Sequence, residues 1–362
     1  MDERGSLVIG LNPHIVKGQP LPRWAKVLLP VAAIVAALAI GALPVILAGG
    51  NLLKAYSALV YGSLGTRFNF LETLVKASPL ILTGLAVSFA FRARFWNIGA
   101  EGQLFAGAVA ATAVGVYCTW LPSFLVVPGC ILAGFIAGGL WAAIPAFLKT
   151  RLRVDDVVTT LLMNYVMIHI MGALLYGPMQ AAGSSWPRSE PIMEAAHYPV
   201  LLERSRLHLG FPLAIALVLV VWFINTKTVF GYRAKCVGVN IDAARFSGID
   251  TGATILGTAL VSGGLAGLAG VGEVCAIHFH LLMDISPGYG YTGIVIAMLG
   301  NLHPLGVALS AFFFSCLSVG SQTMSRMAGI PVYIEGVIEG IALTVMLISI
   351  LFMEYRIRWT RK

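Results

Sequence analysis

Charged residues are scarce in this chain. Only 11% of its 362 residues are Asp, Glu, Lys or Arg, whereas 58% are hydrophobic. A soluble globule of this size would have nowhere to bury so much apolar surface. The composition therefore excludes a soluble domain and predicts an all-α, polytopic membrane protein that uses almost its whole length for spanning helices of about 20 residues each.

Motifs for metal, redox and nucleotide chemistry are also missing. The five cysteines are scattered without CxxC spacing, and we interpret them as packing residues. Neither GxxxxGK[ST] nor HExxH occurs, so this chain shows no sign of hydrolysing ATP itself, and any ATP has to be handled by a partner. The pair His278 and His280 lacks a third ligand and is interpreted as loop surface. We expect no cofactor, no metal and, without a nucleophile and base, no enzymatic reaction.

What the sequence does contain is a series of ten apolar runs. They divide the chain into a leader (1–26), a transmembrane domain (27–353) and a tail (354–362), with long loops at 179–208 and 228–250. The first run resembles a secretory signal, but its core is too long and its leader too extended, which favours a retained anchor helix. The predicted spanning helices are 27–48, 74–91, 98–120, 124–148, 157–178, 209–226, 251–272, 288–302, 305–324 and 332–353.

The distribution of positive charge predicts the topology. Of the 24 Lys and Arg residues, 17 fall in segments on one side of the ten-span arrangement and 6 on the other, with Lys76 at a helix start. The positive-inside rule then places both termini and the loop 228–250 in the cytoplasm, and the loop 179–208 outside. Because the basic residues lie between apolar runs instead of forming one face, we expect no nucleic-acid partner.

Two polar segments that interrupt the apolar runs predict where the transport path of the membrane domain lies. Asn97 to Gln103 follows the first helix of one four-helix block, and Ser286 to Gly293 occupies a similar place in a second block of opposite orientation. This correspondence favours an inverted repeat with a central path between its halves. Residues 273–287 also hold several charges and Pro287, which indicates a broken or re-entrant helix. The match of Gly288, Gly290 and Gly293 to GxGxxG follows no strand and is read as backbone flexibility.

Polar side chains at membrane depth are the candidates for that path. A charged group there costs roughly 2.5 to 3.5 kcal/mol on insertion scales, so Glu101 and the amides of Asn97 and Gln103 are expected to face protein instead of lipid. Glu335 and Glu339 lie one turn apart in the last predicted span; the helix dipole explains Glu335, and a polar role for the deeper Glu339 stays open. Three GxxxG pairs predict close helix contacts, namely Gly134 with Gly138, Gly263 with Gly267, and Gly336 with Gly340.

The loop 228–250 carries a second signal. Asn240 is placed to cap a short helix over 241–247, which Gly248 would end. A capped helix on the cytoplasmic surface suits docking of a partner. The alternative is an ordinary amphipathic connector at the lipid surface.

Four segments together resemble a known family. FWNIGAEGQ at 95–103, TTLLMNYV at 159–166, FGYRAKCVGVNIDAARFSGI at 230–249 and DISPGYGYTGIVIAMLGN at 284–301 are similar to the permease subunit of bacterial ABC importers of the branched-chain amino acid and simple-sugar superfamily. The form Asn-Ile-Gly-Ala-Glu-Gly-Gln resembles its nucleoside branch, which works with basic-membrane-protein receptors. Trp96 departs from the smaller residue that is more usual there.

The resemblance implies a type II importer-like fold in the bacterial inner membrane. It implies an ATP-binding cassette ATPase, a second permease that is identical or diverged, an external substrate-binding protein and a small polar substrate. The family's central path would involve Asn97, Glu101, Gln103 and Asn164. On physical grounds, the rings of Trp96, Tyr289 and Tyr291 are added to this substrate path, since they can stack on a flat substrate. The ATPase-coupling loop would involve Phe230, Gly231, Arg233, Gly238, Asn240, Ala243, Ala244, Arg245 and Gly248. Transport of a simple sugar and an ion-coupled secondary transporter are the alternatives.

Overall fold

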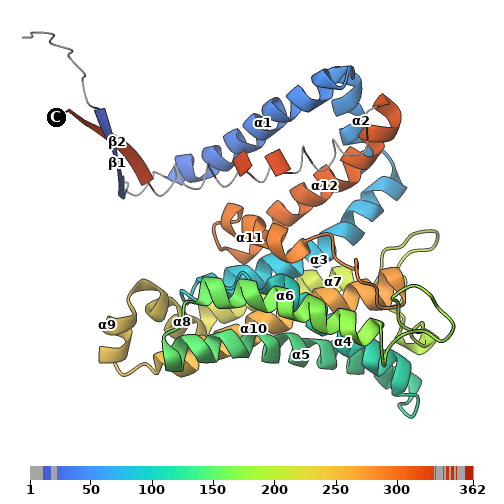
Figure 1. Cartoon of the computed structure of the whole chain (residues 1–362). Coiled ribbons are helices and arrows are strands. Elements are labelled where there is room, and N and C mark those ends of the chain that lie inside the picture. Colours follow the sequence, from blue (N-terminus) through green and yellow to red (C-terminus); the bar gives the residue numbers. More distant parts are fainter. Residues whose placement is uncertain are drawn as a thin grey trace, which may run out of the picture.

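The computed structural model describes residues 11–17, 23–329 and 355–361, with isolated positions between 331 and 348. The described chain is almost entirely helical (Figure 1). Its helices are α1 (Arg23–Leu47), α2 (Leu52–Leu64), α3 (Arg67–Phe91), α4 (Ala100–Tyr117), α5 (Ser123–Leu152), α6 (Asp156–Leu175), η1 (Glu194–Ala196), α7 (Gly210–Lys227), α8 (Val229–Val239), α9 (Ile241–Phe246), α10 (Thr251–Gly272), η2 (Glu273–His278), α11 (Tyr289–Leu299) and α12 (Pro304–Ala328).

Six helices in the described part of the chain are long and apolar enough to cross a membrane. They are α3, α5, α6, α7, α10 continued by η2, and α12, so the chain is a multi-pass membrane protein. The expected count of ten is not confirmed. The run at 288–302 gives only the 11-residue helix α11, about 16 Å long against a hydrocarbon core of about 30 Å. Most of the run at 332–353 lies outside the described residues, as do Glu335, Gly336 and Glu339, and the inverted repeat stays a prediction.

The helices confirm the all-α class, and one short two-stranded sheet accompanies them. Strand β1 (Leu11–Lys17) pairs antiparallel with β2 (Tyr355–Arg361), so that the predicted leader and tail meet. In β2 the larger apolar residues Tyr355, Ile357 and Trp359 alternate with polar ones, which is the period of a strand. This short alternation lies outside the apolar runs from which the spanning helices are predicted.

Two helices form the centre of the bundle. In α3 and in the span that contains α10, 89% and 72% of the apolar window is buried, against 28% in each of α5, α6 and α7. A helix that is apolar all round and buried on all sides belongs in the core. Helices α5, α6 and α7 therefore keep broad apolar faces for lipid or for partner chains.

Glycines allow α5 and α10 to touch. An added Cβ at Gly138 would lie 2.3 Å from the Gly263 carbonyl oxygen, and one at Gly267 would lie 2.3 Å from the Gly134 carbonyl oxygen. Such close backbone approach is what GxxxG pairs permit in membranes. Both predicted pairs in the described residues thus pack against each other.

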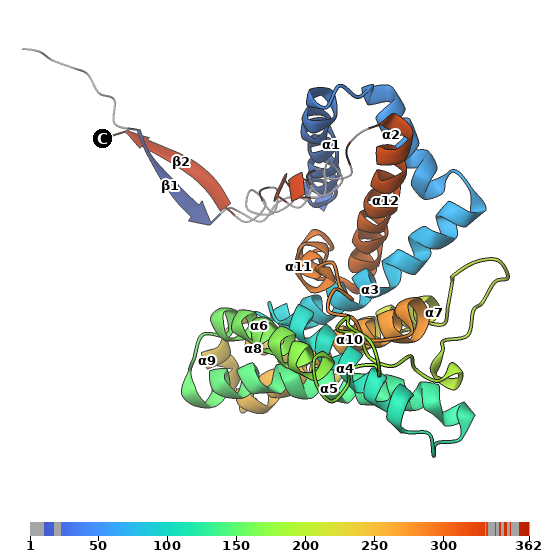
Figure 2. The same cartoon turned by 45° about the vertical axis from the view of Figure 1, so that its right-hand side comes forward.

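A second, smaller layer lies beyond α12. Both views show α1 and α2 beside the part of α12 that lies away from the bundle of α4, α5, α6 and α10 (Figures 1 and 2). Its own apolar cluster contains Ala55 and Leu59 of α2 with Leu317 and Met324 of α12. Helix α2 was not predicted because its 13 residues are too few for a span, although Asn51 caps it by accepting a hydrogen bond from Lys54 N at 3.0 Å.

Candidate functional site

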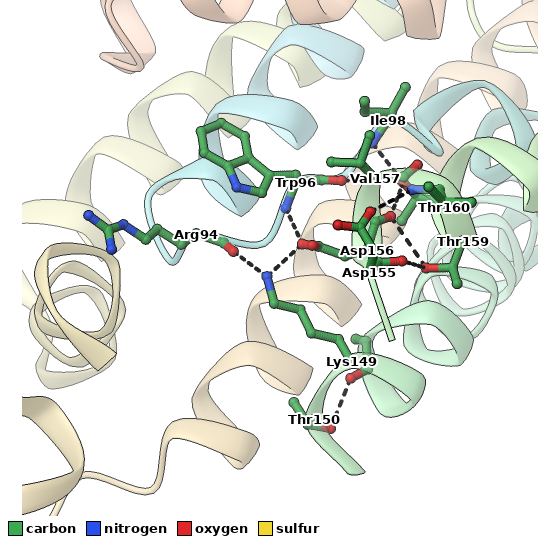
Figure 3. A network of polar contacts seen from close by, with 12 residues as sticks. Arg94, Trp96, Ile98, Lys149, Thr150, Asp155, Asp156, Val157, Thr159 and Thr160 are labelled. Atoms are coloured by element: carbon green, nitrogen blue, oxygen red, sulfur yellow. Dashed lines mark hydrogen bonds and ion pairs between the residues drawn. The ribbon is translucent and has the colours of Figure 1, made fainter. Parts of the chain in front are cut away.

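An ion pair fixes the elbow between α3 and α4, residues 92–99 (Figure 3). Lys149 Nζ lies 2.6 Å from Asp156 Oδ2, and the Trp96 backbone N–H donates to the same carboxylate oxygen at 2.6 Å. Lys149 also donates to the carbonyl of Arg94, a residue at the left-handed φ of 52°. The start of α6, the end of α5 and the elbow are thereby tied together at one point.

Beyond this point the chain turns back among the helices, where two amides pair. Asn97 Nδ2 donates to Gln103 Oε1 at 2.8 Å, and Gln103 Nε2 donates to Asn97 Oδ1 at 2.8 Å. Asn97 Nδ2 also donates to Ser262 Oγ, halfway along α10, at 2.9 Å. Both amides are at most 1% exposed. Mutual pairing satisfies groups whose burial without partners would cost about 1–3 kcal/mol each.

Asn164 connects this turn to α6 and α11. Its Oδ1 accepts from Gly102 N at 2.8 Å, while Nδ2 donates to the Ile98 carbonyl at 3.0 Å and to the Tyr291 hydroxyl at 3.2 Å. Asn164 is fully buried, and Tyr291 is 38% exposed. One amide therefore holds three elements in register.

Glu101 closes the link to the broken helix. Its Oε2 accepts from Gly290 N, in the first turn of α11, at 2.6 Å. The carboxylate thus sits at a helix N-terminus, where the dipole stabilises negative charge. An added Cβ at Gly290 would lie 2.3 Å from Glu101 N, so only glycine permits this approach. Together, Asn97, Glu101, Gln103, Asn164 and Tyr291 form what we call the polar hub.

The interruption before α11 matches the prediction of a broken helix. After α10 the chain forms the π-helical turn η2, then runs irregularly until Gly288, whose φ is 100°. Ser286 Oγ accepts from Tyr289 N at 3.1 Å and so covers one of the open donors at the start of α11. The sequence signals were the charges and Pro287 in this stretch.

A cavity lies beside the broken helix. It measures about 480 Å³, within the range of small-molecule sites, and a narrower space of about 140 Å³ continues from it. Lys76 and Tyr289 line both spaces. Lys76 Nζ lies 2.8 Å from the Tyr289 hydroxyl and 4.8 Å from the ring centroid.

The predicted path residues therefore do not form one surface. Tyr289 lines the cavity, whereas five others make the polar hub. Trp96, in the elbow, is 41% exposed. Its ring packs edge-to-face on the Phe91 ring, with the two centroids 4.7 Å apart. That all seven contribute to a substrate path stays a prediction.

The segment 228–250 folds as two helices. Asn240 Oδ1 accepts from Asp242 N and Ala243 N, each at 3.0 Å, and Gly248 has a φ of 80°. The capped helix α9 is thus confirmed within one residue of its predicted end. Helix α8, which Thr228 caps by accepting from Gly231 N at 3.1 Å, lies where the sequence predicts a loop.

The predicted coupling residues take different positions on these helices. Gly231 and Gly238 face the body: added Cβ atoms would lie 2.1 Å from the Ile224 carbonyl and 1.8 Å from the Arg92 carbonyl. The Phe230 ring stacks on the Phe89 ring, with the two ring centroids 6.2 Å apart. Ala244 is buried, whereas Arg233, Asn240, Ala243, Arg245 and Gly248 are exposed. Helices α8 and α9 enclose a surface groove of about 450 Å³ lined by Val239, Ala243 and Ile249 among others.

The charged residues of the cavity are not among the predicted site residues. Glu72 and Lys76, one turn apart on α3, both line it, and Gln322 and Arg326 face them from α12. The available signal was their spacing: a carboxylate and an ammonium at i and i+4 in an otherwise apolar helix share one face. In the predicted topology, Lys76 is only a charge at a helix start.

These features define the class of protein: a multi-pass membrane protein with a broken helix and a polar cavity among its spans. The chain belongs to the family described as the branched-chain amino acid transport system permease component, whose model matches residues 69–352. It is thus a transport component of ABC systems, as its sequence resemblance implied.

The chain is similar to several curated permeases over most of its length. It is 34% identical to a glucose ABC transporter permease of Haloferax volcanii, over 93% of this chain and 91% of the relative. It is 33% identical to a guanosine ABC transporter permease of Bacillus subtilis, over 93% and 96%. A nucleoside ABC transporter permease of Lactococcus lactis is 30% identical over 84% and 86%. No solved structure matches the chain.

Proposed function

We propose that this chain is the permease subunit of an ABC importer for nucleosides. A separate cassette ATPase drives it, an external binding protein delivers the cargo, and a second permease completes the membrane part. The similarity to guanosine and nucleoside permeases over most of the chain carries this proposal. The run Asn97 to Gln103, whose form resembles the nucleoside branch, also supports it. Three of its residues belong to the polar hub, where α4, α6, α10 and α11 are joined by hydrogen bonds.

A simple sugar is the second candidate cargo, because a glucose permease is equally similar. Both cargoes are neutral and rich in hydroxyls, and a nucleoside adds a flat base. The deciding experiment reconstitutes the permease with its ATPase, second permease and receptor in proteoliposomes. We expect ATP-dependent uptake of radiolabelled guanosine or uridine that unlabelled nucleosides inhibit and glucose does not. ATP-dependent uptake of radiolabelled glucose without uptake of either nucleoside would assign the sugar instead.

The same preparation tests the ion-coupled alternative. Uptake by an ABC importer persists when ionophores collapse the ion gradients and stops when ATP is withheld. A secondary transporter shows the reverse. The polar hub supports the importer reading, since the Glu101 carboxylate is engaged by a backbone N–H at a helix start.

The groove between α8 and α9 is our candidate for the ATPase contact. Its lining is mostly apolar, and beside it Phe246 is 96% exposed. Such a patch on a polar surface is typical of a protein interface. The occupant we propose is the ATPase, because α8 lies directly against the elbow that leads to the polar hub.

We also propose that this groove faces the cytoplasm of a bacterial cell, with both termini on the same side of the inner membrane. The charge distribution supports this orientation. Single cysteines at Ser185 and Asp242, in a cysteine-free background, should react with an impermeant thiol reagent from opposite sides. Labelling from the same side would overturn this topology.

A further inference from the structure

We call the cavity and the narrower space that continues from it the funnel. The residues that line it are charged in the wide part and mostly uncharged in the narrow part. Along α3, Glu72, Lys76 and Leu80 line it at intervals of one turn; along α12, Arg326, Gln322 and Ser318 do the same in the opposite chain direction. Residues four apart share a helix face. The two faces therefore run from a charged rim to an uncharged inner end, where Thr292 of α11 closes the wall.

The charges at the rim balance. Three carboxylates (Glu72, Glu273 and Asp284) and three cationic groups (Lys76, Arg206 and Arg326) line the wider part. Two of the carboxylates already have partners: Arg206 pairs with Glu72, and His278 Nε2 lies 3.5 Å from Glu273 Oε2. A rim of this kind attracts neither anions nor cations strongly. It offers donors and acceptors to a neutral, hydroxylated solute.

The contact between Lys76 and Tyr289 divides the funnel. Both residues line the wide and the narrow space, so their hydrogen bond lies where one passes into the other. A lysine facing the interior of a membrane domain marks a polar pathway. A nucleoside carries groups that match this contact: hydroxyls that accept from the ammonium, and an aromatic base that stacks on tyrosine.

On the basis of the proposed function, we propose that this cavity, between α3, α11 and α12, receives the cargo, and that the Lys76–Tyr289 contact is the gate between its wide and its narrow part. Glu101 sets the position of this gate, because it holds the backbone of Gly290, the residue after Tyr289. The cargo class is a neutral solute that combines hydroxyls with a flat ring.

Cargo-dependent protection of a single cysteine tests the location. Gln322→Cys in a cysteine-free background places a thiol on the cavity wall, and Ser185→Cys places one on an exposed loop as the matched control. The complete complex is labelled during turnover with cargo-loaded or cargo-free receptor. We expect loaded receptor to slow labelling at Gln322→Cys at least threefold and to leave Ser185→Cys unchanged. Equal rates at Gln322→Cys would overturn the proposal.

Filling the inner end tests the passage independently. Thr292→Trp inserts bulk where the narrow space measures about 140 Å³. The control is Thr226→Trp, at an exposed position near the end of α7. We expect Thr292→Trp to reduce uptake at least tenfold, with receptor binding and subunit assembly unchanged, and Thr226→Trp to transport normally. Wild-type uptake by an assembled Thr292→Trp complex would show that cargo takes another route.

The gate has a test of its own that does not depend on filling space. Lys76→Met keeps the stem of the side chain and removes its charge, and Lys54→Met makes the same change at an exposed site. We expect Lys76→Met to alter the relative inhibition by purine nucleosides, pyrimidine nucleosides and free ribose at least fivefold. An unchanged inhibition profile would exclude Lys76 from cargo contact. Failure of the proposed function differs from all these outcomes, because wild-type complex would then import no nucleoside at all.

Discussion

At the scale of single residues, polar groups inside this bundle bind one another. The Asn97 and Gln103 amides each donate to and accept from the other. The Asn164 amide hydrogen-bonds to α4, to the elbow and to α11. A buried amide that lost its partner would carry a penalty of about 1–3 kcal/mol. Such residues resist rearrangement unless a new partner arrives with the motion.

Glu101 offers the sharpest test of the polar hub. Glu101→Ala removes the acceptor for Gly290 N and frees the start of α11. We expect uptake in proteoliposomes to fall at least tenfold while the complex still assembles, because one charge-assisted hydrogen bond of about 1.5–3 kcal/mol positions the helix without holding the whole fold.

Glu101→Gln is the matched variant, since its side-chain oxygen still accepts from Gly290 N. We expect it to retain more uptake than Glu101→Ala. Normal transport by Glu101→Ala would remove the residue from the mechanism, and loss of the protein from the membrane would make its role purely structural.

His208 predicts a pH dependence of stability. Burial lowers the pKa of His208 to about 4, with the nearby Arg206 charge acting in the same direction. Its Nδ1 accepts from Gly210 N at 3.0 Å, so the folded state needs the neutral ring. In the unfolded chain the pKa is about 6.5. The unfolded state therefore binds more protons between these values, and stability is lost as the pH falls from about 6.5 towards 4.

The expected loss through His208 is about 2 kcal/mol at pH 5. Thermal unfolding of the purified protein in detergent at pH 7.5 and pH 5 measures it. His208→Asn keeps an acceptor without titrating in this range, and we expect a smaller drop in Tm between the two pH values. Equal drops in both proteins would contradict the assignment.

At the scale of elements, the contact between α5 and α10 depends on glycine at particular turns. An added Cβ at Gly138 meets Gly263 and Gly267 backbone atoms at 2.3–3.0 Å, whereas one at Gly129 meets only side chains beyond 3.5 Å. Gly138→Ala should therefore force the helices apart, at a cost of about 1–3 kcal/mol.

Gly129→Ala is the control on the same helix. We expect it to be neutral or slightly stabilising, because alanine favours helix by up to about 1 kcal/mol. Thermal unfolding of both variants in detergent gives the comparison. Equal Tm values for the two would mean that α5 and α10 adjust without cost.

Which elements could be predicted from sequence follows from how each is stabilised. The spans α5, α7 and α10 are set by continuous apolar runs, and α9 by a cap and a glycine that act within a few residues. Helices α2 and α8 are short and gain their place from packing on α12 and on the elbow. Strands β1 and β2 are more than 300 residues apart. The alternation in β2 indicates a strand but does not predict which distant segment it pairs with.

The candidate site divides in the same way. The cost of burying charge singled out Glu101, Asn97 and Gln103 from sequence alone. Their mutual pairing was not visible, because it depends on how the elbow folds back among α3, α6 and α10. The funnel could not be predicted either, since Glu72 and Gln322 line the same cavity only when helices distant in sequence pack together.

At the scale of the whole molecule, one continuous set of contacts joins the two candidate surfaces. Helix α8 lies against the elbow at Arg92, where Gly238 permits the approach. The elbow continues into α4, and Glu101 in the first turn of α4 holds Gly290 beside the Lys76–Tyr289 contact. A push on α8 therefore has a short route of packed backbone to the inner end of the cavity.

The capped helix α9 is where such a push would enter. Ala243 is exposed on the groove between α8 and α9, while Ala244 is buried beneath it. Ala243→Arg adds bulk and charge to the proposed ATPase contact, where a buried charge without a partner costs several kcal/mol. We expect uptake and cargo-stimulated ATP hydrolysis to fall together, at least tenfold, while membrane insertion and receptor binding stay normal.

Ala182→Arg makes the same substitution at an exposed position of the loop on the opposite predicted side, and we expect it to leave ATP hydrolysis unchanged. Parallel measurement of uptake, ATP hydrolysis and copurifying ATPase in both variants separates weak docking from broken transmission. Reduced copurification of the ATPase with Ala243→Arg places the fault in docking, whereas full copurification with low hydrolysis places it in the α8 contact with the elbow. Wild-type uptake and hydrolysis in Ala243→Arg would exclude α9 as the element that couples the ATPase to the cavity.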